Sequence, residues 1–235
     1  MNKRQLQAPF FEIGPKNYLF GEQIYDLAKI ADEASQKYGI PVIYTTPYVN
    51  IEQVARRFKN LHVFAPHMDA LLPGRGLSDI LPEALRAAGA QGVMLNHCER
   101  PLSLGVLSKT LLRARDVGLI SIVCADALEE ARAIAVLKPD MMVVEPTALI
   151  GSGRAGDTAY VKAAVGAVRQ VDPTIGVLVG GGVSNAEAVY RIIKAGADAT
   201  GCSSGIATAS DPEALVHEML AAVRQAWDER ALQEK

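Results

Sequence analysis

Short apolar, β-branched runs alternate along the chain with longer segments in which apolar residues recur every three or four positions. Runs such as MMVV and IGVLV are typical of buried strands, whereas residues 21–37 place apolar side chains on one stripe, as an amphipathic helix does. The pattern predicts eight strands, over residues 9–13, 40–45, 61–65, 92–95, 119–124, 141–144, 175–179 and 197–201. It predicts helices between them, the clearest of which cover 21–37, 126–137, 185–194 and 212–226.

Residues that start and stop helices support this reading. A glycine follows the helical pattern in KYGIP, AAGAQG, DVGLI and KAGADA, just before the next strand. Asp126, Ser184-Asn185 and Ser210-Asp211 stand where helices begin, so we expect these side chains to cap helix N-termini.

Eight strand–helix units in 235 residues leave about 29 residues each, close to the minimum for one such step. No Pro/Ser-rich linker or block of charge interrupts the series. We therefore predict an α/β protein with one domain, residues 1–235, folded as a single (β/α)8 TIM barrel. An open doubly wound sheet is the alternative, but the dinucleotide fingerprint GxGxxG does not follow the first strand.

Composition narrows the classes of partner. Hydrophobic residues make up 49% of the chain and charged residues 21%, which is typical of a globular protein. A formal net charge of −2 gives no reason to expect nucleic acid or an anionic membrane as a partner. No apolar run reaches the roughly 18 residues of a membrane helix, and no secretory signal opens the sequence. The three cysteines are far apart in the sequence and do not have the spacing of metal ligands, so we predict no metal site. An odd number of dispersed cysteines also favours a reducing, cytoplasmic location.

In a barrel of this kind, function collects where the strands end. Gly14 and Lys16 follow the first predicted strand, His97 and Glu99 the fourth, and Glu145 the sixth. A lysine, a histidine and a carboxylate from three strand ends can converge on one small ligand. Glycines 180–182 and Ser203-Ser204 follow the last two strands, where backbone N–H groups can face a phosphate.

Each candidate has a simpler alternative. Glu145 ends an apolar strand, so burial would raise its pKa toward the range of a general base, but it could also cap its loop or pair with an arginine. Residues 145–156, rich in glycine, have the composition of a hinged lid. His97 could donate to a carbonyl or merely bond the backbone, and Lys16 could be solvated. His67 is expected to be structural.

Six segments together resemble the triosephosphate isomerase family, most closely its short archaeal-type branch. In chain order they read PKNY, FAPHMDALLPG, LPEALRAAGAQGVMLNHCER, VVEPTALIGSG, GGGVS and SSGI. Each is weak alone, but their order and spacing are highly specific, and the resemblance extends from about Pro9 to the last helix.

The resemblance implies a cofactor-free aldose–ketose isomerase that interconverts dihydroxyacetone phosphate and glyceraldehyde 3-phosphate, as in glycolysis and gluconeogenesis. It implies Glu145 as the base, a neutral His97 as the electrophile, Lys16 as the stabilising cation and Glu99 in support. It further implies phosphate binding at a set of backbone positions: Gly151, Gly181, Gly182, Ser203 and Ser204.

The chain also departs from this pattern. Gly14 stands where the family has an asparagine that touches substrate, Pro15 replaces an aromatic residue, and Pro66 replaces a glutamine. The segment RGLSD, residues 75–79, replaces a Thr-Gly pair used in subunit packing. We therefore keep two further hypotheses: the same proton transfer on another ketose phosphate, such as a tetrulose phosphate, and a non-catalytic phosphate-binding barrel. A homodimer or homotetramer is expected.

Overall fold

The computed structural model describes residues 6–233 and has eight parallel strands that close into a barrel in sequence order. β8 pairs with β1, with Phe10 opposite Ala199 and Ile13 opposite Cys202, so the sheet has no edge at this seam. The strands are β1 (Phe10–Ile13), β2 (Val42–Thr45), β3 (Leu61–Ala65), β4 (Gly92–Leu95), β5 (Ile120–Ala125), β6 (Met141–Val144), β7 (Gly176–Val179) and β8 (Ala199–Cys202). The predicted (β/α)8 barrel is confirmed, and the open doubly wound sheet is wrong.

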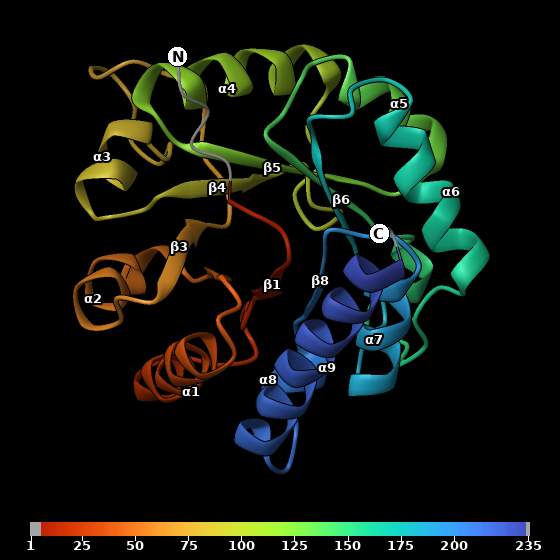
Figure 1. Cartoon of the computed structure of the whole chain (residues 1–235). Coiled ribbons are helices and arrows are strands. Elements are labelled where there is room, and N and C mark those ends of the chain that lie inside the picture. The colour runs from red at the N-terminus through yellow and green to blue at the C-terminus, as the bar shows by residue number, and fades with distance from the viewer. Residues whose placement is uncertain (1–5, 234–235) are drawn as a thin grey trace.

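Helices surround the barrel and cover its outer face (Figure 1). They are α1 (Glu22–Tyr38), α2 (Ile51–Arg57), α3 (Pro82–Ala87), α4 (Leu104–Val117), α5 (Leu128–Ala135), α6 (Thr158–Arg169), α7 (Ala186–Lys194), α8 (Ser204–Ala207) and α9 (Pro212–Gln233), with short 3-10 turns η1 (Tyr48–Asn50) and η2 (Thr147–Leu149). The last helix is longer than the predicted 212–226 because its pattern of buried residues ends before the helix does. None of the helices of residues 6–233 is both long and apolar enough to cross a bilayer.

Two concentric apolar layers hold the fold together. The inner layer fills the barrel and consists of Phe10, Ile43, Phe64, Met94, Ile122, Cys124, Met141, Val143, Leu178 and Ala199. The outer layer, which includes Phe11 and Ile13, packs between the strands and the helices. Successive residues of a strand point to opposite faces, which explains why neighbours in β1 belong to different layers.

The same alternation places the next inward residue of each strand near the end of the barrel where the strands have their carboxyl ends. Glu12 follows Phe10 on the inner face of β1, and Thr45 follows Ile43 on β2. Glu145 follows Val143 just after β6. Above its apolar filling, the barrel therefore presents polar side chains.

The predicted helix ends are mostly confirmed. Gly39 and Gly118 take the left-handed conformation just after α1 and α4, and Asn185 accepts a hydrogen bond from the Ala188 N–H at the start of α7. The prediction for Asp126 is wrong, since α5 begins after Ala127 without a side-chain cap. The Asp126 carboxylate instead accepts a hydrogen bond from the Thr147 N–H, across the end of the barrel.

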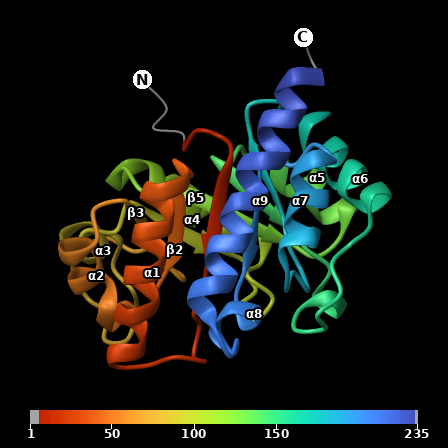
Figure 2. The same cartoon turned by 60° about the horizontal axis from the view of Figure 1, so that its bottom comes forward.

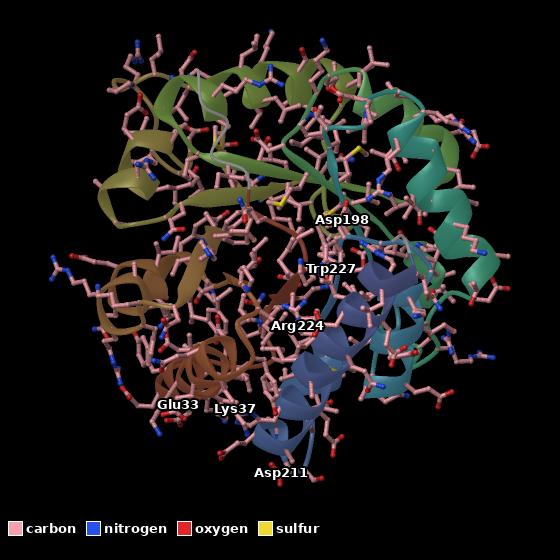
Figure 3. All side chains as sticks on the ribbon, in the orientation of Figure 1. Glu33, Lys37, Asp198, Asp211, Arg224 and Trp227 are labelled. Carbon is pink, nitrogen blue, oxygen red and sulfur yellow. The ribbon has the colours of Figure 1, made fainter. Side chains whose placement is uncertain are left out.

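α1, α9 and α7 lie side by side along one flank, and the short α8 lies at the end of the barrel where β8 terminates (Figure 2). Figure 3 shows Glu33 and Lys37 on α1, and Arg224 and Trp227 on α9. Asp198, labelled in the same view, lies at the opposite end of β8 from the predicted site. Its carboxylate pairs with Arg169 at 2.6 Å and accepts the Val177 N–H at 2.9 Å, so it ties α6, β7 and β8 together.

Candidate active site

A cavity of about 550 Å³ opens at the carboxyl ends of the strands. All ten residues predicted from the sequence line it, from the segments that follow five different strands. They are Gly14, Lys16, His97, Glu99, Glu145, Gly151, Gly181, Gly182, Ser203 and Ser204. Closure of the barrel brings them together, because each follows a strand whose carboxyl end points to the same rim.

His97 is held as a hydrogen-bond donor toward the cavity. The Glu99 N–H donates to its Nδ1 at 3.1 Å, which leaves the proton of the neutral ring on Nε2. Burial lowers the pKa of His97, and the Lys16 cation lowers it further, against an opposing effect of Glu99. The loop that carries the ring is fixed by the Asn96 amide, which binds the Leu102 N–H and the Cys124 carbonyl.

Glu145 faces His97 across the cavity, with its Oε1 3.8 Å from Nε2 of the imidazole. Burial raises the pKa of Glu145 to about 7, although the Lys16 cation and the Gly181 N–H oppose the rise. Its side chain stays 17% exposed, so the carboxylate is desolvated but still reachable from the cavity. A carboxylate with such a pKa is suited to take and return a proton near neutral pH.

Lys16 supplies the positive charge of the site. Its Nζ lies 3.0 Å from Oε1 of Glu99, and its side chain is 24% exposed. The backbone of Lys16 has a positive φ of 48°, a strained conformation for a residue with a side chain. The ion pair places the Glu99 carboxylate beside the Lys16 cation at the rim of the cavity.

The loop of residues 145–156 packs against the glycine turn that follows β7. A Cβ atom at Gly182 would lie 2.3 Å from the Arg154 carbonyl oxygen, and the φ of Gly182 is 69°. Both the close approach and the left-handed backbone require glycine there. The Ser184 hydroxyl donates to the Gly153 carbonyl at 3.3 Å, a second contact between the two loops. The loop therefore lies over one side of the cavity, as a lid would.

Ser203 and Ser204 mark the turn from β8 into α8. The Ser203 hydroxyl donates to the Gly14 carbonyl at 2.6 Å, which joins this turn to the end of β1. The side chain of Ser203 is therefore engaged within the protein, whereas its backbone lines the cavity together with Gly181 and Gly182.

Sequence reasoning missed several polar residues of the cavity wall. Glu12 of β1 is 9% exposed and lines the cavity beside Gly14. His67, expected to be structural, also lines it, as does the buried Thr46. Within residues 6–233, the Thr46 hydroxyl and Nδ1 of His67 have no hydrogen-bond partner. An acidic residue two positions after an inward phenylalanine was the available signal for Glu12.

Comparison with known proteins agrees with this geometry. The family model for triosephosphate isomerase matches residues 16–219. The chain is 35% identical to a triosephosphate isomerase of Sulfurisphaera tokodaii over 229 residues, which are 96% of this chain and 100% of the relative.

Two further archaeal relatives carry the same name. The triosephosphate isomerase of Sulfolobus acidocaldarius is 32% identical over 96% of this chain and 99% of its own length. That of Methanoculleus marisnigri is 31% identical over 92% of this chain and 99% of its own length. Matches of this extent, on a closed barrel with this cavity, establish that the chain belongs to the triosephosphate isomerase family and is an isomerase.

Proposed function

We propose that the protein interconverts dihydroxyacetone phosphate and D-glyceraldehyde 3-phosphate without a cofactor. The observation that carries the proposal is the placement of a buried carboxylate, a neutral imidazole and a lysine cation around one cavity. The glutamate and the neutral histidine have the roles known from triosephosphate isomerase itself, a standard example of pKa tuning.

The chemistry is a proton transfer between two adjacent carbons, coupled to a proton transfer between the oxygens that they carry. The Glu145 carboxylate takes a proton from the carbon next to the carbonyl, and the electron pair of that C–H bond forms the carbon–carbon double bond of an enediolate. Nε2–H of His97 donates to the developing oxyanion, and the Lys16 cation stabilises its charge. His97 moves the proton of the neighbouring hydroxyl to this oxyanion, so that the neighbouring oxygen becomes the new carbonyl oxygen. Glu145 returns its proton to the carbon that carried the old carbonyl, which converts ketose to aldose with no net gain or loss of atoms.

Backbone N–H groups around the cavity are proposed to hold the phosphate. Gly181 and Gly182 have positive φ values of 87° and 69°, and Gly151 in the lid has 71°. Such conformations turn successive N–H groups toward a common point, which suits a phosphate oxygen. Ser203 and Ser204 would add N–H groups from the opposite side. Contacts between the lid and the glycine turn support closure over the bound phosphate, which would keep water from the intermediate.

A second candidate is the same reaction on a larger ketose phosphate, such as a tetrulose phosphate. The observation that favours it is Gly14, which places no side chain on the cavity wall where the family has a polar one. The two candidates share every catalytic group, so only the relative kcat/KM for the two substrates separates them.

Assembly and location are also proposals. Leu72 and Leu77, in the altered loop between β3 and α3, are 68% and 102% exposed, and Phe20 and Val49 are 77% and 88% exposed. Apolar side chains of this number gathered on loops need cover, which supports a homodimer or homotetramer. Reduced cysteines fit a cytoplasmic location, since Cys98, Cys124 and Cys202 are free.

The test is a coupled assay with dihydroxyacetone phosphate and with D-erythrulose 4-phosphate, run in tritiated or deuterated water. Triose turnover with solvent hydrogen entering the product is expected. Glu145→Gln should lose about 100-fold to 10,000-fold in kcat, the range supplied by a positioned general base. A wild-type enzyme that binds phosphate esters but exchanges no hydrogen would overturn the proposal.

A further inference from the structure

Glu12 is a buried carboxyl group in the candidate active site that the proposed reaction does not use. It is 9% exposed, it projects to the inner face of β1, and it lines the same cavity as Glu145, His97 and Lys16. A carboxyl group inside a barrel otherwise filled by Phe10, Ile43 and other apolar side chains is costly to bury. Such a group needs a structural or functional reason.

Two glycines make room for this carboxyl group. A Cβ atom at Gly14 would lie 2.9 Å from Oε1 of Glu12, and one at Gly201 would lie 3.0 Å from Oε2. Gly14 has no positive φ, so its backbone would accept a side chain, and the three atoms nearest to the added Cβ all belong to the Glu12 carboxyl. The carboxyl group therefore occupies the space into which a side chain at position 14 would extend.

The surroundings of Glu12 favour its protonated form when a phosphate ester is bound. Burial raises the pKa of Glu12 to about 7, the Thr45 hydroxyl opposes the rise, and negative charge on Glu145 raises it further. The charged and titratable groups around it are Lys16, Glu145, Cys124 and Cys202. The Lys16 cation lowers the pKa of both carboxyl groups, and Glu145 also accepts the Gly181 N–H, a hydrogen bond that favours its ionised form.

A dianionic phosphate entering this cavity adds negative charge, which raises the pKa of Glu12 again. A protonated carboxyl group can donate a hydrogen bond, as the N–H of an amide does. From the cavity floor, it can donate to a carbonyl, hydroxyl or phosphate-ester oxygen of a ligand.

We propose that Glu12 contacts the substrate, donating a hydrogen bond from the cavity floor to an oxygen of the sugar phosphate in the space that Gly14 leaves open. This assignment rests on the proposed sugar-phosphate isomerase and names one more substrate-contacting residue for it. The active form of the enzyme holds one proton on the pair of carboxyl groups, with Glu12 protonated and Glu145 ionised.

The first test compares pH profiles of kcat/KM for triose phosphate, from about pH 5.5 to about pH 9.5, in the wild type, Glu12→Gln and Glu12→Ala. The wild type should show a bell, because activity needs Glu145 ionised and Glu12 protonated. Glu12→Gln keeps a donor at every pH, so it should retain kcat/KM within about threefold at the optimum and lose the alkaline limb. Glu12→Ala should lose about tenfold to 100-fold across the range.

The second test exchanges the two positions. Gly14→Asn alone should lose activity, since its side chain collides with the Glu12 carboxyl. The double variant Glu12→Ala/Gly14→Asn has room for the amide and should recover about tenfold over Glu12→Ala. Additive effects of the two substitutions would contradict a shared position for the two side chains.

A binding measurement separates this inference from the proposed function. Calorimetric titration with sn-glycerol 3-phosphate should give a Kd about tenfold weaker for Glu12→Ala than for the wild type, with Glu12→Gln unchanged. Equal affinities for all three proteins, with an unchanged alkaline limb in Glu12→Gln, would overturn the role of Glu12 even if isomerase activity is found. Absence of any isomerase activity would overturn the proposed function, while the titration would still decide whether Glu12 meets the ligand.

Discussion

The buried carboxyl of Glu12 should make the stability of the folded protein fall as the pH rises. Its pKa is raised in the folded state from 4.5 to about 7, so the folded chain holds a proton that the unfolded chain releases. Below the pKa of Glu12 in the unfolded chain, the shift does not lower the free energy of unfolding. As the pH rises from that pKa to the pKa in the folded protein, the free energy of unfolding falls. The perturbation to make is Glu12→Gln, which keeps the size of the side chain and removes the titration.

The magnitude follows from the difference between the two pKa values. About 2.5 units at about 1.4 kcal/mol per unit give on the order of 3 kcal/mol. Glu12→Gln should therefore gain about 3 kcal/mol over the wild type between about pH 4 and about pH 8. For a chain of this length, the Tm of Glu12→Gln should therefore exceed that of the wild type by about 6–12 °C more at the upper end of this pH range than at the lower end.

The assay is urea unfolding of both proteins at several pH values, with Glu33→Gln as the control. Glu33 lies on the outer face of α1, 52% exposed in its side chain and paired with Lys29, far from the barrel interior (Figure 3). The control should follow the wild type closely across the range. A stability difference between Glu12→Gln and the wild type that does not grow with pH would refute the reasoning, since the carboxyl would then already be ionised in the folded state.

Four other substitutions test the fold and the lid. Gly182→Ala and Gly39→Ala should each lose about 1–2 kcal/mol of stability, because both glycines have left-handed backbones. Only Gly182→Ala should also lower kcat/KM, by about tenfold or more, since its Cβ displaces the lid at Arg154; equal activities would contradict the lid contact. Asp198→Ala should destabilise by about 1–3 kcal/mol in urea unfolding without changing KM, because it breaks contacts at the end of the barrel remote from the site. Phe10→Ala should cost about 3–5 kcal/mol by the same measurement, since it leaves a cavity in the inner layer; a smaller loss would mean that the barrel collapses around the gap.

The amino-acid sequence determined the order of elements and their type. Strand and helix periodicity, with glycines such as Gly39 and Gly118 between them, was enough to predict eight units and one domain. The ends of elements shifted by one or two residues, as at β1 and β8, since periodicity marks which residues are buried and not where hydrogen bonding stops. The sequence also predicted that Lys16, His97 and Glu145 lie at strand ends, because each of them follows an apolar run that is typical of a buried strand.

Tertiary structure decided what no local pattern contains. Asp126 was predicted to cap a helix, but its partner is Thr147 on another loop, which only the closed barrel brings near. Glu12 lies within an apolar strand, and its proposed role depends on the space at Gly14, just after β1, and at Gly201 of the neighbouring β8. Local periodicity gives the face on which a side chain lies. It is the closure of the sheet that sets which strands meet at the rim, how much water remains there, and thus the pKa and the partner of each side chain.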